Sequence, residues 1–476
     1  MEDQNPRREL LKGGLATLGG WLASPLIPKK QSERSLQTSS PLVTNDIAYV
    51  WSGALTHSSI KINVSMKYSS KVQILYQDES GFELLTEPLD LLDRSSQTNN
   101  IASFTLNDLK PDMTYLYWVV SNGVILRKQG RFKTPRAGVY SYKFAFGNCC
   151  KTGSESSIFL DIAKQEPLFF LQLGDLHYEN ITIGSQGLYR EAYRKALSSS
   201  TQAAMYSEVP SVYMWDDHDF GGDNADKNSN SADAAQRTYR QCVPHYPLPK
   251  AEGAIYHSFI VGRIKFVVTD GRSNRDPSSQ FDDSNKSMLG KDQKAWLKNE
   301  LLRGKFDNPL TIWVNNVPWI SQKDADTWAG YSTERNEIAN FIEENEISNI
   351  AMLGGDAHIL AIDDGRNNRF GDAKKNLFPV FHAGPLDSNP VYRGGPYEQL
   401  APQLNNNYGI VEIFDYGQGI DVFWSGYHVA ESSDADGRRS FNNNQQVGFS
   451  FSMPEPQNKI IADDHKVYLP FTRKAP

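Results

Sequence analysis

Cysteine is scarce in this sequence. Among 476 residues only Cys149, Cys150 and Cys242 carry a thiol. Three thiols are too few for a disulfide framework, and an odd number leaves at least one without an intramolecular partner. At least one of these cysteines therefore needs a chemical or structural reason to be present.

An excess of positive charge is also lacking. The chain has 49 lysines and arginines against 56 acidic residues, a formal net charge of -7. This balance argues against a general nucleic-acid binder, which neutralises many phosphates with basic side chains. With 39% hydrophobic and 22% charged residues, the composition also excludes collagen, coiled coil and wholesale disorder. A ligand that bears phosphate must find local positive charge or a metal ion.

The apolar run at residues 13–27 is short and rich in glycine. A stable membrane span needs about 20 strongly apolar residues, so we expect none here. Arg7, Arg8 and Lys12 precede the run, and the whole resembles a twin-arginine export signal over residues 1–27. A disordered basic start is the alternative, and the cleavage site stays open because Pro25 follows the small residues.

An export signal of this kind predicts a bacterial protein of the periplasm or the medium, with the twin-arginine machinery as a partner. That machinery carries folded proteins, commonly with a cofactor already bound, which is a first indication of a metal.

Four regions follow the expected signal. Residues 28–45 are polar and rich in serine and glutamine, as in a linker. Residues 46–136 hold short β-prone runs about ten residues apart, which predict a small β-sandwich. Residues 137–430 alternate buried-strand runs with helical segments, an α/β pattern. Residues 431–476 form a C-terminal extension whose pattern resembles nothing familiar.

The stretch from Leu109 to Tyr115 resembles the leucine-proline-tyrosine corner of fibronectin type III-like domains. We interpret the 46–136 region as a support or lid, with carbohydrate or surface binding as the alternative. In the α/β region we expect helices over residues 292–302 and 333–344.

Ligand-type residues follow four of the predicted strands in the α/β region. Functional groups of such folds gather at the carboxyl ends of the strands. Two cations about 3.5 to 4 Å apart can clamp a phosphate and acidify a water molecule, given a bridging carboxylate, further ligands and a proton donor. The four strand ends carry Cys149, then Asp175 and Tyr178, then Asp216, Asp217 and His218, and finally Asp356 and His358.

The order of the motifs resembles a known family. The chain has FGxC at 146–149, LGDxxY at 173–178, WDDHD at 215–219, TDGRxxR at 269–275, LGxxQxxWLxxxL at 289–301 and GGDxH at 354–358. This order is similar to that of the alkaline phosphatase D (PhoD-like) family of calcineurin-like metallophosphoesterases, from about residue 45 to 425. The resemblance implies a metallophosphoesterase-type β-sandwich core flanked by helices, preceded by a fibronectin III-like all-β domain.

The resemblance also implies roles for single residues. Asp175 is expected to bridge two metals, while Cys149 and Tyr178 bind Fe³⁺, which suits a thiolate and a phenolate. Asp217, Asp356 and His358 complete the metal ligands, and Ca²⁺ is the expected second ion. His218 is expected to protonate the leaving oxygen and Arg272 to hold the phosphoryl group.

Several alternatives stay open. Cys150 could replace Cys149, and Asp216 could replace Asp217. Arg272 could instead form a salt bridge with Asp270 or Asp276. Asn224 and Asn228 are both candidates for an asparagine near the second metal, and Cys242 is expected to be a core thiol, with a disulfide to Cys150 as the alternative.

The sequence therefore predicts an exported, metal-dependent phosphoric ester hydrolase, acting as phosphatase or phosphodiesterase. One alternative is a phosphodiesterase for phospholipid or a teichoic-acid-like polymer. The other is a non-catalytic cell-surface binding protein, against which the complete set of ligand-type residues argues.

Overall fold

The computed structural model describes residues 37–38, 46–68, 71–91, 100–433 and 439–456. The expected export signal lies outside the described residues, as does the expected linker except for strand β1 (Gln37–Thr38). Residues 457–476 of the expected C-terminal extension also lie outside them. Within the described ranges, no helix combines the length and apolar character needed to cross a membrane.

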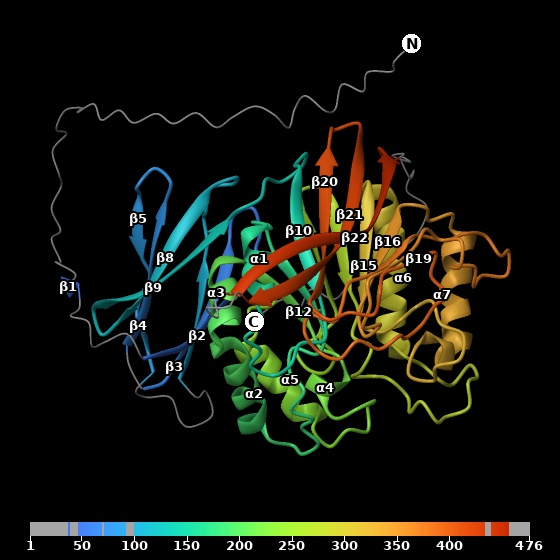
Figure 1. Ribbon diagram of the computed structural model, residues 1–476, viewed down its shortest axis with the longest axis horizontal. Helices are drawn as coiled ribbons and strands as arrows, with labels where there is room; N and C mark the ends of the chain where they lie inside the picture. The colour runs from blue at the N-terminus through green and yellow to red at the C-terminus, as the bar shows by residue number, and fades with distance from the viewer. Residues whose placement is uncertain (1–36, 39–45, 69–70, 92–99, 434–438, 457–476) are drawn as a thin grey trace, which may run out of the picture. The chain divides into compact units, whose positions relative to one another are not determined.

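Two large sheets form the centre of the fold (Figure 1). The first runs in the order β22 (Arg439–Pro454), β21 (Gly419–Ser433), β20 (Asn407–Asp415), β10 (Tyr142–Gly147), β11 (Phe170–Leu173), β12 (Ser211–Met214), β2 (Ile47–Gly53), β3 (Ile60–Met66) and β7 (Ile101–Leu106). The second runs in the order β13 (His257–Val261), β14 (Ile264–Val268), β15 (Leu310–Asn315), β16 (Ile350–Gly354), β18 (Val380–His382), β17 (Ala361–Asp363) and β19 (Gln399–Leu400).

Central strands of both sheets are parallel. β10, β11 and β12 pair in parallel in the first sheet, and β14, β15, β16 and β18 do so in the second. Parallel strands deliver the residues that follow them to the same edge of the sheet. The candidate residues after β10, β11 and β12 therefore lie at one edge of the first sheet, and those after β16 lie at the carboxyl edge of the second.

The core between the sheets is aromatic and aliphatic. Phe144 of β10 stacks on Phe169 at 5.0 Å between ring centroids and meets Phe266 of β14 edge to face at 5.4 Å. The next residue, Ala145, points to the opposite face of the strand, toward the helices. Both faces of β10 are thus covered, which explains its nearly continuous apolar sequence. Full burial of a phenylalanine side chain contributes about 1.5 to 3 kcal/mol.

Helices cover the outer faces of both sheets. The expected helices near 292–302 and 333–344 are confirmed as α6 (Gly290–Asp307) and α7 (Ser332–Glu344). Buried side chains pack α1 (Ile158–Lys164), α2 (Gln186–Ser198), α3 (Ser200–Glu208), α4 (Asp217–Phe220) and α5 (Ala232–Cys242) on the first sheet. On the second sheet the same is true of α6 (Gly290–Asp307), α7 (Ser332–Glu344) and the 3-10 helix η2 (Trp328–Tyr331). The expected α/β sandwich core flanked by helices is confirmed.

A further antiparallel sheet precedes this core. It contains β4 (Lys71–Asp78), β5 (Glu83–Leu85), β6 (Leu89–Asp90), β8 (Thr114–Ser121) and β9 (Val124–Lys133). Its apolar face packs against β3 and β7. The expected tyrosine corner is present, because the hydroxyl of buried Tyr115 accepts a hydrogen bond of 2.8 Å from the backbone N–H of Lys110.

The N-terminal β region is joined to the α/β core by strand pairing. Gly53 of β2 pairs with Ser211 of β12, and a Cβ at Gly53 would lie 2.4 Å from the Ser211 carbonyl oxygen. The boundary expected at residue 136 stays a prediction. At the other end, β21 and β22 form a long hairpin beside β20, so part of the expected C-terminal extension continues the first sheet (Figure 1).

All three cysteines are free and buried. The alternative of a disulfide between Cys150 and Cys242 is therefore wrong. Cys242, at the end of α5, lies in the apolar cluster between the helices and the first sheet, as expected for a core thiol.

Candidate metal centre

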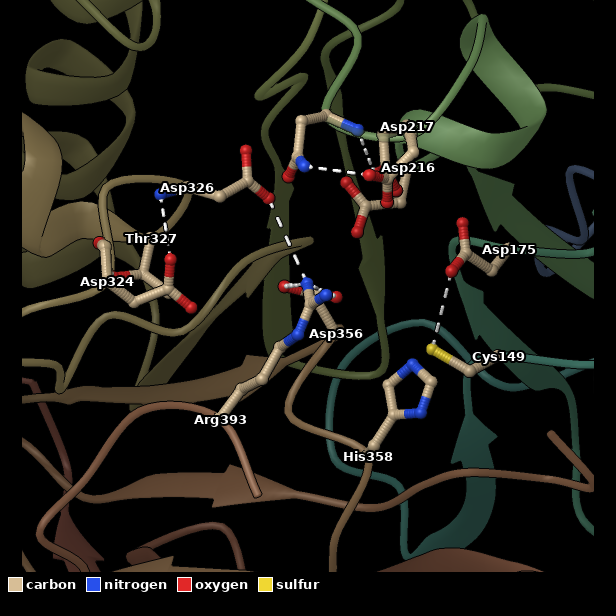
Figure 2. A network of polar contacts seen from close by, with 12 residues as sticks. Cys149, Asp175, Asp216, Asp217, Asp324, Asp326, Thr327, Asp356, His358 and Arg393 are labelled. Carbon is tan, nitrogen blue, oxygen red and sulfur yellow. Dashed lines mark hydrogen bonds and ion pairs between the residues drawn. The ribbon is translucent and has the colours of Figure 1, made fainter. Parts of the chain in front are cut away.

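Four strand ends bring thiol, carboxylate and imidazole groups together. Cys149, Asp175, Asp217 and His358 follow β10, β11, β12 and β16, and Figure 2 shows their side chains gathered around one space. Cys149 Sγ lies 3.6 Å from Asp175 Oδ2. The convergence predicted from the four strand ends is thus present in the fold.

Two groups of potential metal ligands share one carboxylate. Cys149, Asp175 and His358 form one group, and Asp175, Asp217 and His218 form the other. Within each group the ligand atoms lie within 4.8 Å of one another. Asp175 belongs to both, which is the position that a bridging carboxylate requires.

The backbone adopts left-handed conformations at the strand ends. Cys149, Asp175, Asp356 and His358 have φ values of 60°, 53°, 57° and 52°. Such angles are uncommon outside glycine and cluster at functional sites. Two backbone hydrogen bonds, from Cys149 N to Gly174 O (3.1 Å) and from Cys150 N to Asp175 O (2.8 Å), hold the first two strand ends together.

Glycines beside these residues permit close packing. A Cβ at Gly174, whose φ is 100°, would lie 2.5 Å from the Cβ of Asp216. A Cβ at Gly355 would lie 2.5 Å from the carbonyl oxygen of Leu173 and 2.6 Å from that of Asn316. Without side chains at these two positions the four strand ends approach closely enough to share ligands.

Burial and mutual repulsion govern the charges of these groups. Burial, followed by the charges of Asp217 and Asp216, raises the pKa of Asp175 well above its ordinary value. Burial and the neighbouring Asp175 raise the pKa of the Cys149 thiol. Buried acids so close together are costly unless positive charge compensates them.

The donor set fits a pair of cations. Asp175 Oδ1, Asp217 Oδ1 and Asn316 Oδ1 are buried atoms without a hydrogen-bond partner among the described residues. Unpaired buried oxygens are rare in folded proteins and call for an explanation such as an ion. Together with the thiol of Cys149 and the imidazole of His358, these oxygens form a mixed sulfur, nitrogen and oxygen set suited to metal ions.

Cys149, rather than Cys150, faces this space. Cys150 lies in the apolar cluster beneath the helices, and its thiol is directed to the Lys151 carbonyl oxygen at 3.4 Å. Burial raises the pKa of Cys150 as well, but this residue belongs to neither ligand group. The geometry therefore favours Cys149 over its neighbour.

Asp216 and Asp217 have different surroundings. Asp216 Oδ1 accepts hydrogen bonds of 2.6 Å from Arg272 Nε and from Asn316 Nδ2. Asp217 accepts a hydrogen bond of 2.6 Å from the Asn224 backbone N–H through Oδ2, while its Oδ1 has no hydrogen-bond partner among the described residues and lies 3.8 Å from Arg272 Nη2. Burial raises the pKa of Asp217, but the charges of Arg272 and His218 outweigh burial and leave it lower than usual. Asp216 Oδ2 also has no hydrogen-bond partner among the described residues, but of the two aspartates Asp217 belongs to a ligand group, which favours it as the ligand.

His358 has a defined tautomer. Its Nδ1–H donates to the Asn389 carbonyl oxygen at 2.6 Å, which leaves the Nε2 lone pair for the centre. Burial lowers the pKa of His358 and so favours the neutral ring that binds metal.

Tyr178 lies beside His358. Its hydroxyl is 3.5 Å from His358 Nε2 and 3.5 Å from Ser388 Oγ. Burial, then the neighbouring Cys149 and Asp175, raise the pKa of this phenol, so a tyrosinate here needs a nearby cation. The predicted ligation by Tyr178 stays a prediction.

His218 is held from the side opposite the centre. Asn180 Oδ1 accepts a 2.6 Å hydrogen bond from His218 Nδ1, and the ring lies 4.3 Å from that of Tyr178 between centroids. Asn180 thus positions the ring. His218 belongs to the second ligand group, so its predicted role as proton donor stays a prediction beside ligation.

Arg272 is enclosed. Its side chain has 0% exposure, with Nε bound to Asp216 and Nη1 and Nη2 at 3.2 and 3.3 Å from the Asp326 carboxylate oxygens. It pairs with these two residues rather than with Asp276, and its backbone N–H donates to Asp270. The predicted contact with phosphate stays a prediction, while the structure gives Arg272 a second task, the neutralisation of Asp216 and Asp326.

Sequence reasoning missed two residues that contact the candidate carboxylates, Asn316 at Asp216 and Arg393 at Asp356. Asn316 directly follows β15, so the strand-end rule that found the other groups would have found it too. Arg393 Nη1 donates to Asp356 Oδ1 and Oδ2 at 2.9 and 3.1 Å, but it lies in a loop without a motif. Of the asparagines considered, Asn224 contacts Asp217 through its backbone, and Asn228 bonds to Asp226.

The two packed sheets between helices, with ligand groups at the strand ends, define a metallophosphoesterase-like core. The family model described as PhoD-like phosphatase matches residues 144–410. The chain therefore belongs to the PhoD-like phosphatase family.

Individual relatives are distant. Alkaline phosphatase D from Bacillus subtilis (strain 168) is 26% identical over 302 residues, which are 52% of this chain and 52% of that protein, so the match spans about half the length of this curated relative. A structure of PhoD has a TM-score of 0.70 at 18% identity and covers 87% of this chain and 92% of its own. The purple acid phosphatase PPD1 from yellow lupin (Lupinus luteus) seeds has a TM-score of 0.59 at 13% identity and covers 85% and 74%. At these identities the two structures show the fold alone.

Proposed function

We propose that this protein is an exported, metal-dependent phosphoric ester hydrolase. The observation that carries the proposal is the pair of ligand groups joined by Asp175 at the carboxyl edge of the sheets. Membership of the PhoD-like phosphatase family supports the reaction class. The paired Arg7 and Arg8 before a short apolar run support twin-arginine export to the periplasm or the medium.

The donor types suggest which ion each group takes. The thiol of Cys149 and the phenol of Tyr178 suit Fe³⁺, with His358 beside them. The oxygens of Asp217 and Asn316 suit a harder ion such as Ca²⁺. Asp356, the remaining carboxylate predicted as a ligand, belongs to neither ligand group and accepts from Arg393 through both oxygens. Bound at these groups, two cations supply the charge that polarises a phosphate ester and makes a water molecule acidic enough to attack phosphorus.

The protein side chains position and move the proton. Asn180 fixes the ring of His218 by accepting from Nδ1, so Nε2, which lies 3.8 Å from Asp223 Oδ1, is the atom that exchanges a proton with the substrate. As an imidazolium, His218 gives that proton to the leaving oxygen. The backbone carbonyl of Asn389 holds the His358 ring in the same manner.

The proposal is tested on purified, metal-loaded protein. We expect hydrolysis of p-nitrophenyl phosphate or its bis-ester, together with a visible tyrosinate-to-iron absorption band. The ratio of the two rates shows whether the protein is a monoesterase or a diesterase. Action on phospholipid or a phosphate polymer requires diesterase activity. A Cys149→Ser variant should lose iron and the band together, because the thiolate is one of its ligands. A folded protein that hydrolyses neither ester contradicts the function, and a colourless, iron-free but active protein contradicts the iron assignment.

Cys242→Ser should leave turnover unchanged. Cys242 is fully buried outside both ligand groups, and its contact with the Asn63 side chain uses the backbone carbonyl. A hydroxyl in this apolar cluster should cost about 1 to 3 kcal/mol of stability. Steady-state kinetics and a thermal melt check the expectation. Loss of iron in this variant would show that Cys149 is the wrong thiol and that Cys242 supports the centre.

A further inference from the structure

The loop at residues 388–397 contacts three of the four strand ends, the second of them through Ser388 Oγ, which lies 3.5 Å from the Tyr178 hydroxyl. The Ser388 backbone N–H donates to the Cys149 carbonyl oxygen at 3.3 Å, and the Asn389 carbonyl oxygen accepts from His358 Nδ1. Arg393, further along the loop, binds Asp356. The loop therefore reaches the centre with one side chain that carries a positive charge.

Three arginines, Arg272, Arg275 and Arg393, surround Asp326 in a charge network, and Arg393 is the accessible one. Asp326 pairs with Arg272 and Arg275, whose side chains have 0% exposure, and lies 4.0 Å from Arg393, whose side chain is 29% exposed. The contacts of Arg393 with these carboxylates, among the residues that the structure describes, all use Nη1. A guanidinium has five N–H donors in a planar fork, so donors remain for a ligand.

The backbone of Arg393 is firmly held. Its N–H donates to the Ala357 carbonyl oxygen at 3.4 Å, and its carbonyl oxygen accepts from the Tyr397 hydroxyl at 3.3 Å. The next residue, Gly394, has a φ of 78°, and a Cβ there would lie 2.7 Å from the Ile320 carbonyl oxygen. A fixed backbone lowers the entropy lost when the side chain binds a ligand.

The direction of the side chain suits an anion at the centre. Figure 2 shows the Arg393 guanidinium directed at Asp356 and Asp326, with Cys149, Asp175 and His358 grouped on the other side of the view. When Asp356 serves a cation, Arg393 remains beside it with free donors. Arginine binds phosphate oxygens through paired, charge-assisted hydrogen bonds.

We propose that Arg393 binds the phosphoryl group of the substrate and favours a doubly charged monoester over a diester; this rests on the proposed function. Arg272 and Arg275 then serve to hold Asp216 and Asp326, while Arg393 contacts the ligand. Because a diester has one negative charge fewer, it gains less from the guanidinium.

The test compares Arg393→Met with Arg366→Met in metal-loaded protein. Arg366 is a matched control, since it also pairs with two carboxylates, Asp364 and Glu398, but its side chain is 62% exposed and it contacts none of the centre's ligands in the described residues. Inorganic phosphate is the probe, with its dissociation constant measured by calorimetry, and metal content and KM are measured on the same samples.

Arg393→Met should weaken phosphate binding and raise KM for p-nitrophenyl phosphate by about 10- to 100-fold, with a smaller rise for the bis-ester. Arg393→Lys should restore part of the affinity, because a lysine keeps the charge without the planar fork. Metal content and the thermal midpoint should stay at wild-type values, as in Arg366→Met. Unchanged phosphate binding, or lost metal that accounts for the weaker binding, overturns the proposal. A wild-type protein that neither binds phosphate nor hydrolyses either ester overturns the proposed function itself.

Discussion

Replacing Asp175 by asparagine should remove both metals and lower kcat/KM by at least about 100-fold. The carboxylate belongs to both ligand groups, so one substitution affects two ions at once. Substitution of residues that only support a metal ligand already costs about 10- to 100-fold in affinity or activity. Elemental analysis of the purified variant, beside its kinetics, measures both losses.

Stability should respond to this substitution in opposite ways with and without metal. Burial, then the charges of Asp217 and Asp216, raise the pKa of Asp175 in the metal-free fold. When the pKa of an acid is higher in the folded than in the unfolded state, the fold becomes less stable as pH rises from the unfolded-state pKa to the folded-state pKa. At neutral pH in EDTA, Asp175→Asn should therefore melt no lower than the wild type. With metals present, the wild type alone should gain stability, because only its folded state binds them tightly.

Asp363→Asn provides the control. Asp363 is a fully buried aspartate of β17 that belongs to neither ligand group. Its Oδ1 accepts from the Gly365 and Asn367 backbone N–H groups. This variant should keep its metals and its turnover. Full metal content or full activity in Asp175→Asn would show that the shared carboxylate does not hold the ions.

The strand-end residues were predictable because the rule that places them is local and geometric. A buried apolar run followed by a polar residue identifies a strand end, and parallel pairing then brings several such ends to one edge. Cys149, Asp175, Asp217 and His358 were found by this reasoning, and the fold brings them together. Asn316 obeys the same rule after β15 and could have been included.

The charge network was not predictable, because it depends on contacts between distant loops. Arg272 meets Asp326, which is 54 residues away and lies in the segment before η2. Arg393 meets Asp356 from a loop that has no periodic pattern. Sequence patterns report which side chains follow a strand, but not which arginine a loop encloses and which it leaves accessible.

The N-terminal region illustrates the same limit. Local pattern predicted its short strands and the corner at Tyr115, and both are present. The pairing of Gly53 with Ser211, which extends the first sheet into this region, joins residues far apart in the chain. The sequence marks this pairing only by the glycine at position 53, and the need for a glycine there becomes evident only when the neighbouring strand is known.

Arg272→Met should lower the free energy of unfolding by about 3 to 5 kcal/mol, the cost of removing one partner from a buried ion pair. Burial raises the pKa of Asp216 to about 7 even though the Arg272 charge beside it acts in the opposite direction. Without the guanidinium, Asp216 is left buried without its cation, while Asp326 keeps only its pairs with Arg275 and Arg393. Because domains are stable by only about 5 to 15 kcal/mol, the loss should be plain in a urea titration followed by tryptophan fluorescence.

The pH dependence separates this structural task from a direct contact with phosphate. Protonation of Asp216 removes the charge that has lost its guanidinium, so the stability deficit of Arg272→Met in EDTA should be smaller near pH 5 than near pH 8. Arg272→Lys keeps the charge and should recover part of the stability, which keeps the comparison available if the methionine variant folds poorly. An Arg272→Met protein with wild-type stability at both pH values, but with weakened binding of inorganic phosphate, would instead assign Arg272 the phosphate contact expected from the sequence and leave Arg393 as the counter-ion of Asp356.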